Sequence, residues 1–368
     1  MIDGLERALD AWAGEGARDL LAGLEPLLGG PGVHGRLLAA ESLPRDRVLR
    51  VRAEIAGCPR SLIVKRFPPE RAHRERIAIE RWLPRVGLEA QGPPLLATVA
   101  ERSGRFTWFV YEDLGDCTLA EHASDPGRVR AAVALLAELH ARFTDHPLLG
   151  EARQLGADLG VAFYGASVCD AARALEALLA NASLASAERA ICLGLLERLA
   201  LMRLEQAKRA AALEAWGGPE TLLHGDPWTI NVLVRATCSG LEARLIDWDH
   251  AGVGPVSYDL STFLMRFPSG ERAQILSHYQ ERHAAGSARG RRWPSRAEWN
   301  ALFDTAERAR IASAILWRAL AALDGHLAWA LEELTELERA LSVLGPVLPT
   351  GPTPLAGIGD SRLAGGPP

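Results

Sequence analysis

A histidine, an aspartate and an asparagine lie within the largely apolar segment LLHGDPWTINVLV, residues 222–234: His224, Asp226 and Asn231. A polar group among apolar residues costs free energy unless it has a partner. Side chains of these types can hold a metal ion or accept a proton. Their grouping in one short segment indicates a site, provided that partners are found elsewhere in the chain.

A second carboxylate is expected to lie beside this segment. Residues 231–248 are typical of two strands around the turn 237–240, and a hairpin centred near Ser239 would place Asn231 directly opposite Asp247. Opposed residues have Cβ atoms roughly 5 Å apart. An amide oxygen beside a carboxylate suits Mg²⁺, with phosphate oxygens and water completing its shell. Each residue alone fits a plain structural role, and the nearby aspartate of the first segment favours a shared site.

These segments resemble two motifs of the aminoglycoside phosphotransferase and choline kinase superfamily. HGDPWTIN (224–231) resembles its H-G-D-x-x-x-x-N catalytic loop. LIDWDHAGVGPVSYDLS (245–261) resembles its metal segment, with Asp247 as the metal aspartate and Asp259 as the downstream landmark. The resemblance covers roughly residues 35–345. It implies an α+β, two-lobed protein-kinase-like fold and a phosphotransferase with an alcohol group as acceptor.

The resemblance implies a role for each polar residue, since phosphoryl transfer depends mostly on positioning and charge neutralisation. Asp226 would orient the acceptor hydroxyl and take its proton. Asn231 and Asp247 would hold Mg²⁺ against the nucleotide phosphates, and His224 would brace the loop. An alternative makes His224 and Asp226 metal ligands of a hydrolase, but only His250 is near enough in sequence to assist.

A lysine in the predicted small lobe fits the same chemistry. Lys65 and Lys208 are the only lysines among 41 basic residues. In SLIVKRF, strand alternation places Ile63, Lys65 and Phe67 on one face. An ammonium and a guanidinium are not interchangeable, so a lysine here in an arginine-rich chain favours binding of the α- and β-phosphates over a surface role.

A glutamate on the following helix is expected to fix that lysine. Residues 68–87 are typical of a helix, with proline at the start and glycine past the end. Glu75 shares a helical face with Ile79 and Trp82, whereas Glu80 lies beside two arginines and is expected in solvent. The family pattern also matches Glu75, which is therefore the predicted partner.

Further landmarks rest on the resemblance alone. FVYEDLG resembles the linker between lobes, where main-chain groups bond the adenine edge, so Glu112, Asp113 and Leu114 are named for their position. The helix end LLAELHA resembles a family landmark in which His140 is structural.

The phosphate loop departs from the family pattern. No glycine lies between Gly35 and Gly57, so the segment lacks the glycine-rich turn that lets amides approach phosphates. Ser42, Arg45 or Arg47 would contact the phosphates instead. The alternatives are weak nucleotide binding, or a nucleotide other than ATP.

Composition limits the class of protein. The chain has 368 residues, 48% of them hydrophobic, and a net charge of −5. A nucleic-acid partner would need a basic surface. No apolar run is long enough for a membrane span, and the N-terminus lacks the order of a signal peptide. Five scattered cysteines without a CxxC pair favour reduced thiols. We expect a cytoplasmic protein that binds neither nucleic acid nor membrane; its oligomeric state is not predicted.

Four segments are expected along the chain. Residues 1–34 form a helical extension, and 35–112 form a nucleotide-binding lobe with a small antiparallel sheet and one key helix. Residues 113–345 form a larger, mainly helical lobe for catalysis and acceptor binding. The Pro/Gly-rich residues 346–368 are expected to be a disordered tail.

The acceptor is expected to be a small hydroxylated molecule, because the segment between Asp247 and Asp259 is too short to dock a protein. Carboxylates would suit an aminoglycoside and an aromatic box would suit a quaternary amine, and neither set decides between them. The candidate side chains are Asp304, Glu307, Asp324, Glu332, Glu333 and Glu336, and Trp293, Trp299, Trp317 and Trp329.

These observations predict Mg²⁺-dependent transfer of the γ-phosphate of ATP, with GTP as an alternative, to an aminoglycoside-type or other antibiotic. The modest negative charge slightly favours a cationic or neutral acceptor over a phosphorylated one. One alternative is a kinase of a metabolite such as choline or a sugar. Another is a catalytically weak, kinase-like regulator that binds nucleotide, which only the missing glycine loop favours.

Overall fold

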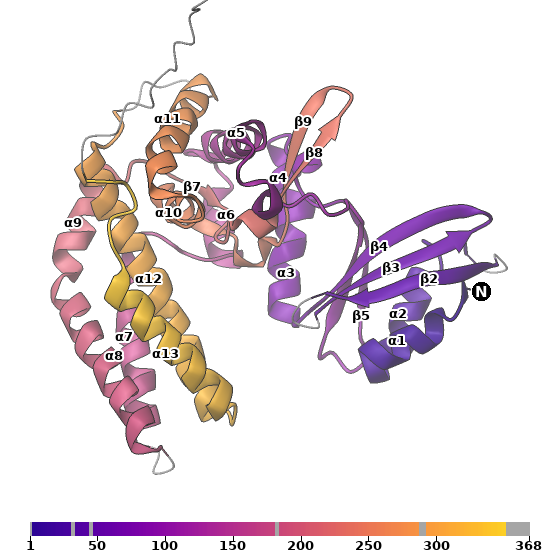
Figure 1. Cartoon of the computed structure of the whole chain (residues 1–368), viewed down its shortest axis with the longest axis horizontal. Coiled ribbons are helices and arrows are strands. Elements are labelled where there is room, and N and C mark those ends of the chain that lie inside the picture. The colour runs from indigo at the N-terminus through magenta and orange to yellow at the C-terminus, as the bar shows by residue number, and fades with distance from the viewer. Residues whose placement is uncertain (1, 31–33, 44–46, 181–183, 287–291, 351–368) are drawn as a thin grey trace, which may run out of the picture.

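The computed structural model describes residues 2–30, 34–43, 47–180, 184–286 and 292–350. It has a small lobe built on a six-stranded sheet and a larger lobe that is mostly helical (Figure 1). The predicted α+β, two-lobed arrangement is confirmed. Arg45 and residues 351–368 lie outside the described residues.

The sheet of the small lobe has the strand order β1-β2-β3-β4-β6-β5. Its neighbours are antiparallel except at the edge, where β1 runs parallel to β2 and Ile2 lies opposite Gly35. The predicted antiparallel sheet of residues 35–112 is confirmed, and the N-terminal extension adds one short parallel strand at its edge. The strands are β1 (Ile2–Asp3), β2 (Gly35–Ser42), β3 (Val48–Ile55), β4 (Cys58–Phe67), β5 (Leu95–Ala100) and β6 (Thr107–Glu112).

The two faces of the sheet bury different partners, as the alternation along β4 requires. Leu62 and Val64 pack with the N-terminal helices α1 (Leu5–Ala13) and α2 (Ala17–Leu24). Phe67 belongs to the core that continues into the large lobe. Figure 1 shows α1 and α2 on one side of the sheet and α3 on the side of the large lobe. Lys65 shares the face of Phe67, which directs it toward the large lobe.

The helix predicted for residues 68–87 is present, with a change of pitch inside it. It comprises α3 (Pro69–Ile77), the π-helical turn η2 (Ala78–Trp82) and α4 (Leu83–Arg85). Proline at its first turn is compatible with a helix start. Single π-turns inside helices are frequent near functional sites, and this one directly follows the turn that carries Glu75.

Short strands and helices of the large lobe position the predicted catalytic segments. Strand β7 (Glu220–Leu223) pairs with β10 (Gly252–Pro255), and β8 (Val232–Thr237) pairs with β9 (Gly240–Leu245). Around them lie α5 (Pro126–Phe143), α10 (Ser257–Leu264) and α11 (Ser269–Gly286). The remaining helices are η1 (Gly14–Gly16), η3 (Glu89–Gln91), η4 (Leu119–His122), η5 (Thr229–Asn231), η6 (Trp248–His250), α6 (Leu149–Leu155), α7 (Val161–Leu179), α8 (Ser186–Leu204), α9 (Gln206–Trp216), α12 (Arg296–Leu323) and α13 (Leu327–Val343).

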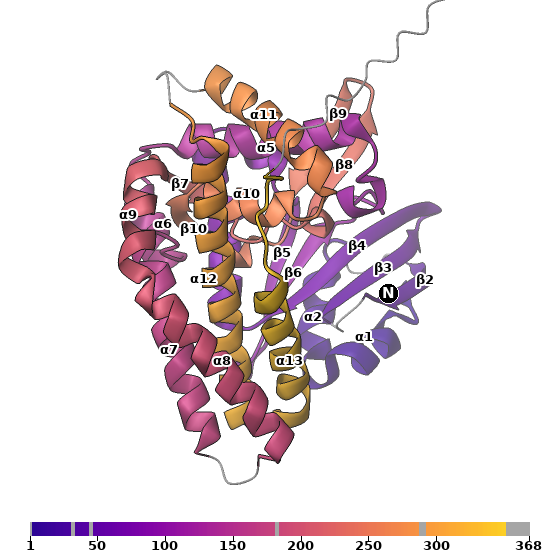
Figure 2. The same cartoon turned by 60° about the vertical axis from the view of Figure 1, so that its left-hand side comes forward.

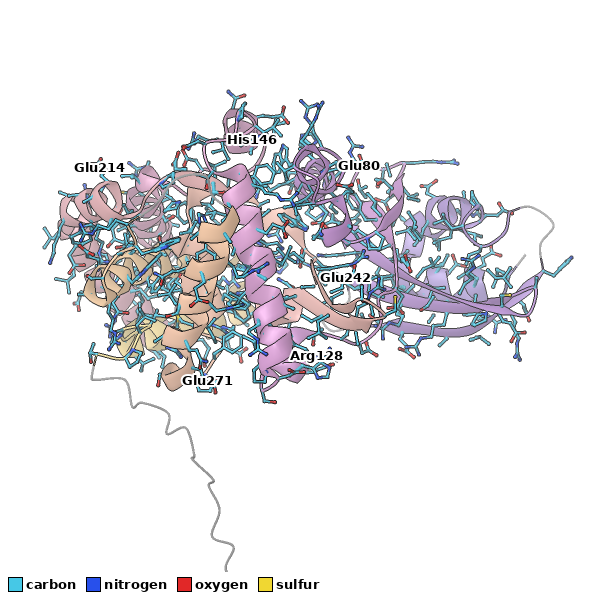
Figure 3. All side chains as sticks on the ribbon, turned by 90° about the horizontal axis from the view of Figure 1, so that it is seen from above. Glu80, Arg128, His146, Glu214, Glu242 and Glu271 are labelled. Carbon is cyan, nitrogen blue, oxygen red and sulfur yellow. The ribbon has the colours of Figure 1, made fainter. Side chains whose placement is uncertain are left out.

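Helix α5 anchors the hairpin β8–β9. Asp125 caps the helix by accepting hydrogen bonds from Gly127 N and Arg128 N at 2.8 and 3.3 Å, as aspartate commonly does at the start of a helix. The Arg128 guanidinium donates to Val234 O of β8. Figure 3 labels Arg128 near the start of α5 and Glu242 on the hairpin beside it. The hairpin that leads from Asn231 to Asp247 is therefore held by the helix.

A helical bundle forms the part of the large lobe away from the sheet. Buried apolar residues of α7, α8, α12 and α13 share one core, and Figure 2 shows these helices side by side. Among the described residues, no helix is long and apolar enough to cross a membrane.

The start of the predicted disordered tail is wrong. Val347 and Leu348 are only 2% and 3% exposed and belong to the main core. The Asn300 amide accepts from Leu348 N at 2.8 Å and donates to Leu348 O at 3.0 Å. Burial of two apolar residues outweighs the flexible composition of this stretch, at least as far as it is described.

We expect Leu20→Ala to lower the free energy of unfolding by about 2–5 kcal/mol, because it leaves a cavity between α2 and the sheet. Leu20 is fully buried there. Urea denaturation measures the change. Leu38→Ala removes the same side chain at a position that is 47% exposed, and we expect a change below about 0.5 kcal/mol. Equal losses in the two variants would contradict the packing of α2 on the sheet.

Candidate active site

The lobes meet at an ion pair between Lys65 and Asp247, which are 182 positions apart in sequence. Burial opposes ionisation of Asp247, but the Lys65 ammonium outweighs it and lowers the Asp247 pKa to about 2. Burial also opposes the charge on Lys65, yet Asp247, Glu75 and Asp249 together raise its pKa. Both groups are therefore charged at neutral pH. The Asp247 carboxylate could bind a cation and the Lys65 ammonium an anion.

The predicted catalytic loop brings Asp226 and Asn231 together. The Asn231 amide nitrogen donates to Asp226 O at 2.9 Å and to Asp226 Oδ2 at 3.2 Å. Both bonds use the NH₂ group, so the amide oxygen stays available as a ligand. An amide oxygen and the ionised Asp247 carboxylate are the hard donors that fit Mg²⁺.

The predicted register of the hairpin is wrong by one residue. Thr237 pairs with Gly240, and Ile246 N donates to Asn231 O at 3.0 Å, so Asn231 lies opposite Ile246 rather than Asp247. A shift of one residue moves a side chain to the other face of a strand. Asp247 lies just beyond the strand in the left-handed region, with φ 70° and ψ 64°. This turn, which is strained for a residue other than glycine, brings its carboxylate into the cleft.

The buried carboxylate of Asp259 holds the start of the catalytic loop. It accepts hydrogen bonds from His224 N at 2.8 Å and Gly225 N at 2.9 Å, and it lies 3.2 Å from His140 Nε2. The other His140 ring nitrogen lies 2.8 Å from the Tyr279 hydroxyl. Burial raises the pKa of Asp259, but these hydrogen bonds and neighbouring charges outweigh it and lower the pKa overall. Asp259 therefore joins the other two motif residues predicted to be structural, His140 and His224.

His224 links the catalytic loop to the metal segment. Its Nε2 lies 2.9 Å from Ile246 O, its Nδ1 accepts from Asp226 N at 3.3 Å, and its ring packs edge-on against Trp248. Burial lowers the His224 pKa, so the ring is neutral at pH 7. Both ring nitrogens are occupied within the protein. Across the described residues, no three His, Cys, Asp or Glu side chains gather to hold a metal ion.

Gly225 occupies a position that only glycine can take. Its φ is +84°, and an added Cβ would lie 2.0 Å from His250 O. The close approach lets the loop pass directly over the metal segment.

Glu75 points into the site, and Glu80 pairs with Arg76 at the surface, as predicted. Tyr111 OH donates to Glu75 Oε1 at 2.7 Å, and Oε2 has no hydrogen-bond partner among the described residues. Burial raises the Glu75 pKa to about 8, although Lys65 opposes this. In this state Lys65 contacts Asp247, not the glutamate predicted to fix it.

The sequence reasoning missed three residues that connect α3 to the metal segment. Arg74 Nη1 donates to Asp249 O at 2.9 Å, and Arg71 Nη1 lies 3.3 Å from Asp249 Oδ2. Burial and the adjacent Asp247 raise the pKa of Asp249. Asp249 could have been noticed in the sequence, because it is a second acid two residues after the predicted metal aspartate. Arg71 and Arg74 could not, because arginine is abundant throughout the chain.

The linker residues lie where the sheet enters the large lobe. Glu112 ends β6. The Asp113 carboxylate lies 3.0 Å from Arg50 Nε in an ion pair and accepts a hydrogen bond from Ser61 Oγ at 2.6 Å. Glu112 N and Asp113 N donate to Pro94 O and Ser61 O at 3.0 and 3.3 Å, so a contact of the main chain from Glu112 to Leu114 with adenine stays a prediction. Ser42 and Arg47 are exposed at the facing ends of β2 and β3.

The two sets of acceptor candidates do not form sites. Asp304 pairs with Arg209 and Arg308, and buried Glu307 accepts from Ser261 and Thr262. Glu333 and Glu336 also pair with arginines, while Asp324 and Glu332 are exposed. Trp293 and Trp299 stack within the core, whereas Trp317 and Trp329 are exposed on α12 and α13. Neither a carboxylate cluster nor an aromatic box results from these side chains.

At pH 7 we expect Asp259→Asn to lower the free energy of unfolding by about 3 kcal/mol, because an amide cannot satisfy the same buried donors. Folding lowers the pKa of Asp259, so the carboxylate stabilises the folded state fully at a pH above its ordinary pKa of 3.8. This stabilisation decreases as the pH falls further. The difference in the free energy of unfolding between wild type and variant, measured by urea denaturation, should therefore be smaller at pH 3. Exposed Asp324→Asn is the matched control. A gap independent of pH would contradict this role of the carboxylate.

Glu75 should make stability fall as the pH rises. Its folded pKa of about 8 lies above its ordinary value of 4.5, so the stabilisation is full below 4.5 and is lost as the pH approaches 8. In the wild-type protein we expect the free energy of unfolding to fall by a few kcal/mol between pH 4.5 and pH 8. In Glu75→Gln this fall should be absent, as measured by urea denaturation across that range. Glu80→Gln, at the exposed position, should retain the wild-type slope. The same slope in all three proteins would refute the proposed charge state.

Comparison with known proteins identifies the family. Residues 45–299 match the family model described as the phosphotransferase enzyme family. A search of curated proteins found no match.

Solved structures share the fold at low sequence identity. An ethanolamine kinase of Plasmodium vivax has 12% identity, covers 83% of this chain and 81% of its own, and has a TM-score of 0.56. The choline kinase LicA of Streptococcus pneumoniae has 14% identity, covers 89% of this chain and 99% of its own, and has a TM-score of 0.52. A spectinomycin phosphotransferase has 12% identity, 85% and 90% coverage, and a TM-score of 0.50. Since the family model spans more than half of the chain, this protein belongs to the phosphotransferase enzyme family, whose members phosphorylate hydroxyl groups of small molecules.

Proposed function

We propose that this protein is a small-molecule kinase that transfers the γ-phosphoryl group of ATP, or alternatively GTP, to a hydroxyl group, with Mg²⁺ bound in the cleft. One observation carries the proposal: Lys65 of the small lobe meets Asp247 beside the Asp226–Asn231 pair of the large lobe. An ammonium, a carboxylate pair and an amide oxygen are the groups that phosphoryl transfer requires.

Each side chain has a defined task in this proposal. Asn231 Oδ1 and the Asp247 carboxylate would hold Mg²⁺, which neutralises phosphate charge when bound. Lys65 would leave Asp247 to bind the α- and β-phosphates. Asp226, oriented by the Asn231 amide, would accept the hydroxyl proton as the acceptor oxygen attacks the γ-phosphorus. A phosphate ester and the nucleoside diphosphate are the products.

The nucleotide is assigned to the cleft between the lobes. The spectinomycin phosphotransferase was solved with ADP and spectinomycin, which supports a nucleotide and an acceptor side by side in this fold. The main chain from Glu112 to Leu114 would meet the adenine edge. Ser42 and Arg47 are the described candidates for the phosphate contacts that a glycine-rich turn would otherwise make.

The pairing of acidic side chains with arginines affects which charge an acceptor is expected to have. The carboxylates expected to attract an aminoglycoside are mostly paired with arginines. A polycationic acceptor therefore has less support than another antibiotic or a hydroxylated metabolite. The intact set of Lys65, Asp226, Asn231 and Asp247 counts against a catalytically inactive regulator.

We expect Asp226→Asn to lower transfer by about 100- to 10,000-fold, because the amide cannot accept the hydroxyl proton. The assay uses γ-labelled ATP and GTP with aminoglycosides, choline-like amines, sugars and hydroxy acids as acceptors. Asp10→Asn, on the exposed side of α1, is the matched control and should transfer at the wild-type rate. Transfer that survives in Asp226→Asn would contradict the mechanism. Failure of the wild-type protein to bind Mg²⁺-nucleotide would contradict the function.

A further inference from the structure

An exposed tryptophan lies within the catalytic loop, next to the predicted base. Trp228 N donates to Asp226 O at 2.8 Å, and Trp228 O accepts from Asn231 N at 2.7 Å. The two bonds place Trp228 in the same turn as the base and the metal ligand. Its side chain is nevertheless 37% exposed, which is unusual for a tryptophan in so compact a loop. The turn that carries Asp226 therefore presents an indole at the surface.

A guanidinium group covers this indole. Arg266 Cζ lies 4.1 Å from the centre of the Trp228 ring, a close cation–π contact. Arg266 follows α10, the helix whose Asp259 carboxylate fixes the catalytic loop. We call Trp228 and Arg266 the platform. Trp228 is part of the loop, and Arg266 is connected to the loop through α10 and Asp259. Both residues belong to the large lobe, from whose side an acceptor would approach.

Arg266 has no carboxylate partner in the part of the chain that the structure describes, and its side chain is exposed. A guanidinium carries five N–H donors, and across the described residues none of those of Arg266 is taken by a carboxylate. Those donors match the two oxygens of a carboxylate or phosphate group. In the same region, arginines of α12 are paired: Arg308 with Asp304, and Arg310 with Glu307.

Other positive charges lie close to this platform. Arg272 donates to Phe267 O and Val347 O at 2.8 and 3.0 Å. Burial, followed by repulsion from Arg266, lowers the Arg272 pKa. On the other side of the loop, Arg310 donates to Gly225 O at 3.0 Å. The influence of Arg266 on Arg272 indicates that these two positive charges lie near each other.

We infer that the acceptor carries an anionic group, a carboxylate or a phosphate, and that Arg266 on Trp228 binds it. The inference rests on the proposed kinase function and specifies its acceptor class. It reverses the slight preference for a cationic acceptor that the net charge of −5 suggested, because most of the negative charge near the site is already paired with arginine.

The first test determines the charge of the acceptor directly. Desalted bacterial metabolites are separated on anion and cation exchangers, and each fraction is incubated with the full chain, Mg²⁺ and γ-labelled ATP. We expect labelled product from the fraction retained by the anion exchanger. Product only from the cation-exchange or unretained fraction overturns the inference and leaves the kinase function intact. No product from any fraction counts against both.

Phosphatase treatment of the active fraction before the assay distinguishes the two anionic groups. A phosphorylated acceptor loses its anionic group, so transfer falls, whereas a carboxylate acceptor is unaffected. Binding of Mg²⁺-ATP, measured separately by calorimetry, tests the nucleotide half of the proposed function without any acceptor.

The second test assigns the contact to Arg266. We expect Arg266→Gln to raise the acceptor KM about tenfold or more, as for loss of a charged hydrogen-bond pair, while the nucleotide KM stays within about twofold. Arg266→Lys should restore part of the affinity. Arg173→Gln, which removes a guanidinium that is 79% exposed on α7, is the matched control. A raised nucleotide KM with an unchanged acceptor KM would show that Arg266 binds the nucleotide phosphates and would overturn the inference.

Discussion

The whole catalytic loop depends on one fully buried carboxylate. Asp259 has no contact with solvent, yet its pKa is lowered because His140 and the N–H groups of His224 and Gly225 surround it. A buried charge persists only where its environment is fixed. This requirement determines the conformation of the loop: the amides must face α10, so Asp226 and its neighbours must face the cleft. A residue with no proposed part in phosphoryl transfer thus fixes the loop that carries Asp226, the proposed base.

The cleft itself concentrates charges of both signs. Lys65 and Asp247 neutralise each other across the lobes, and Arg74 ties α3 to the backbone of Asp249. Buried pairs contribute little net stability after desolvation, and their more secure effect is to fix an arrangement. Here the pairs fix the position of α3 against the metal segment. Phosphate groups would compete with Asp247 for Lys65, and Glu75, which has an unpaired oxygen, lies near enough to influence the released ammonium.

The sequence was sufficient for local motifs and insufficient for contacts that only the tertiary fold creates. Lys65 could be found because lysine is rare in this chain and strand alternation has a fixed period. The predicted register of the hairpin was wrong by one residue because turn composition does not determine its centre, so Asn231 lies opposite Ile246 and Asp247 follows beyond the strand. Arg74 could not be recognised, since nothing local separates it from other arginines. Val347 was assigned to a tail because proline and glycine around it mask a long-range apolar contact.

The net charge of the chain does not determine the charge of its acceptor, for a related physical reason. Interactions between exposed charges are screened beyond about 10 Å, so an acceptor responds to the few groups around Asp226 and not to the total. Asp304 and Glu307 contribute to the negative total, but their pairing with arginines removes most of their effect in the cleft. Arg266, which stacks on an aromatic ring instead of pairing with an acid, keeps its charge available. In an arginine-rich enzyme, the informative guanidinium is therefore the one that lacks an acidic partner beside the reacting groups.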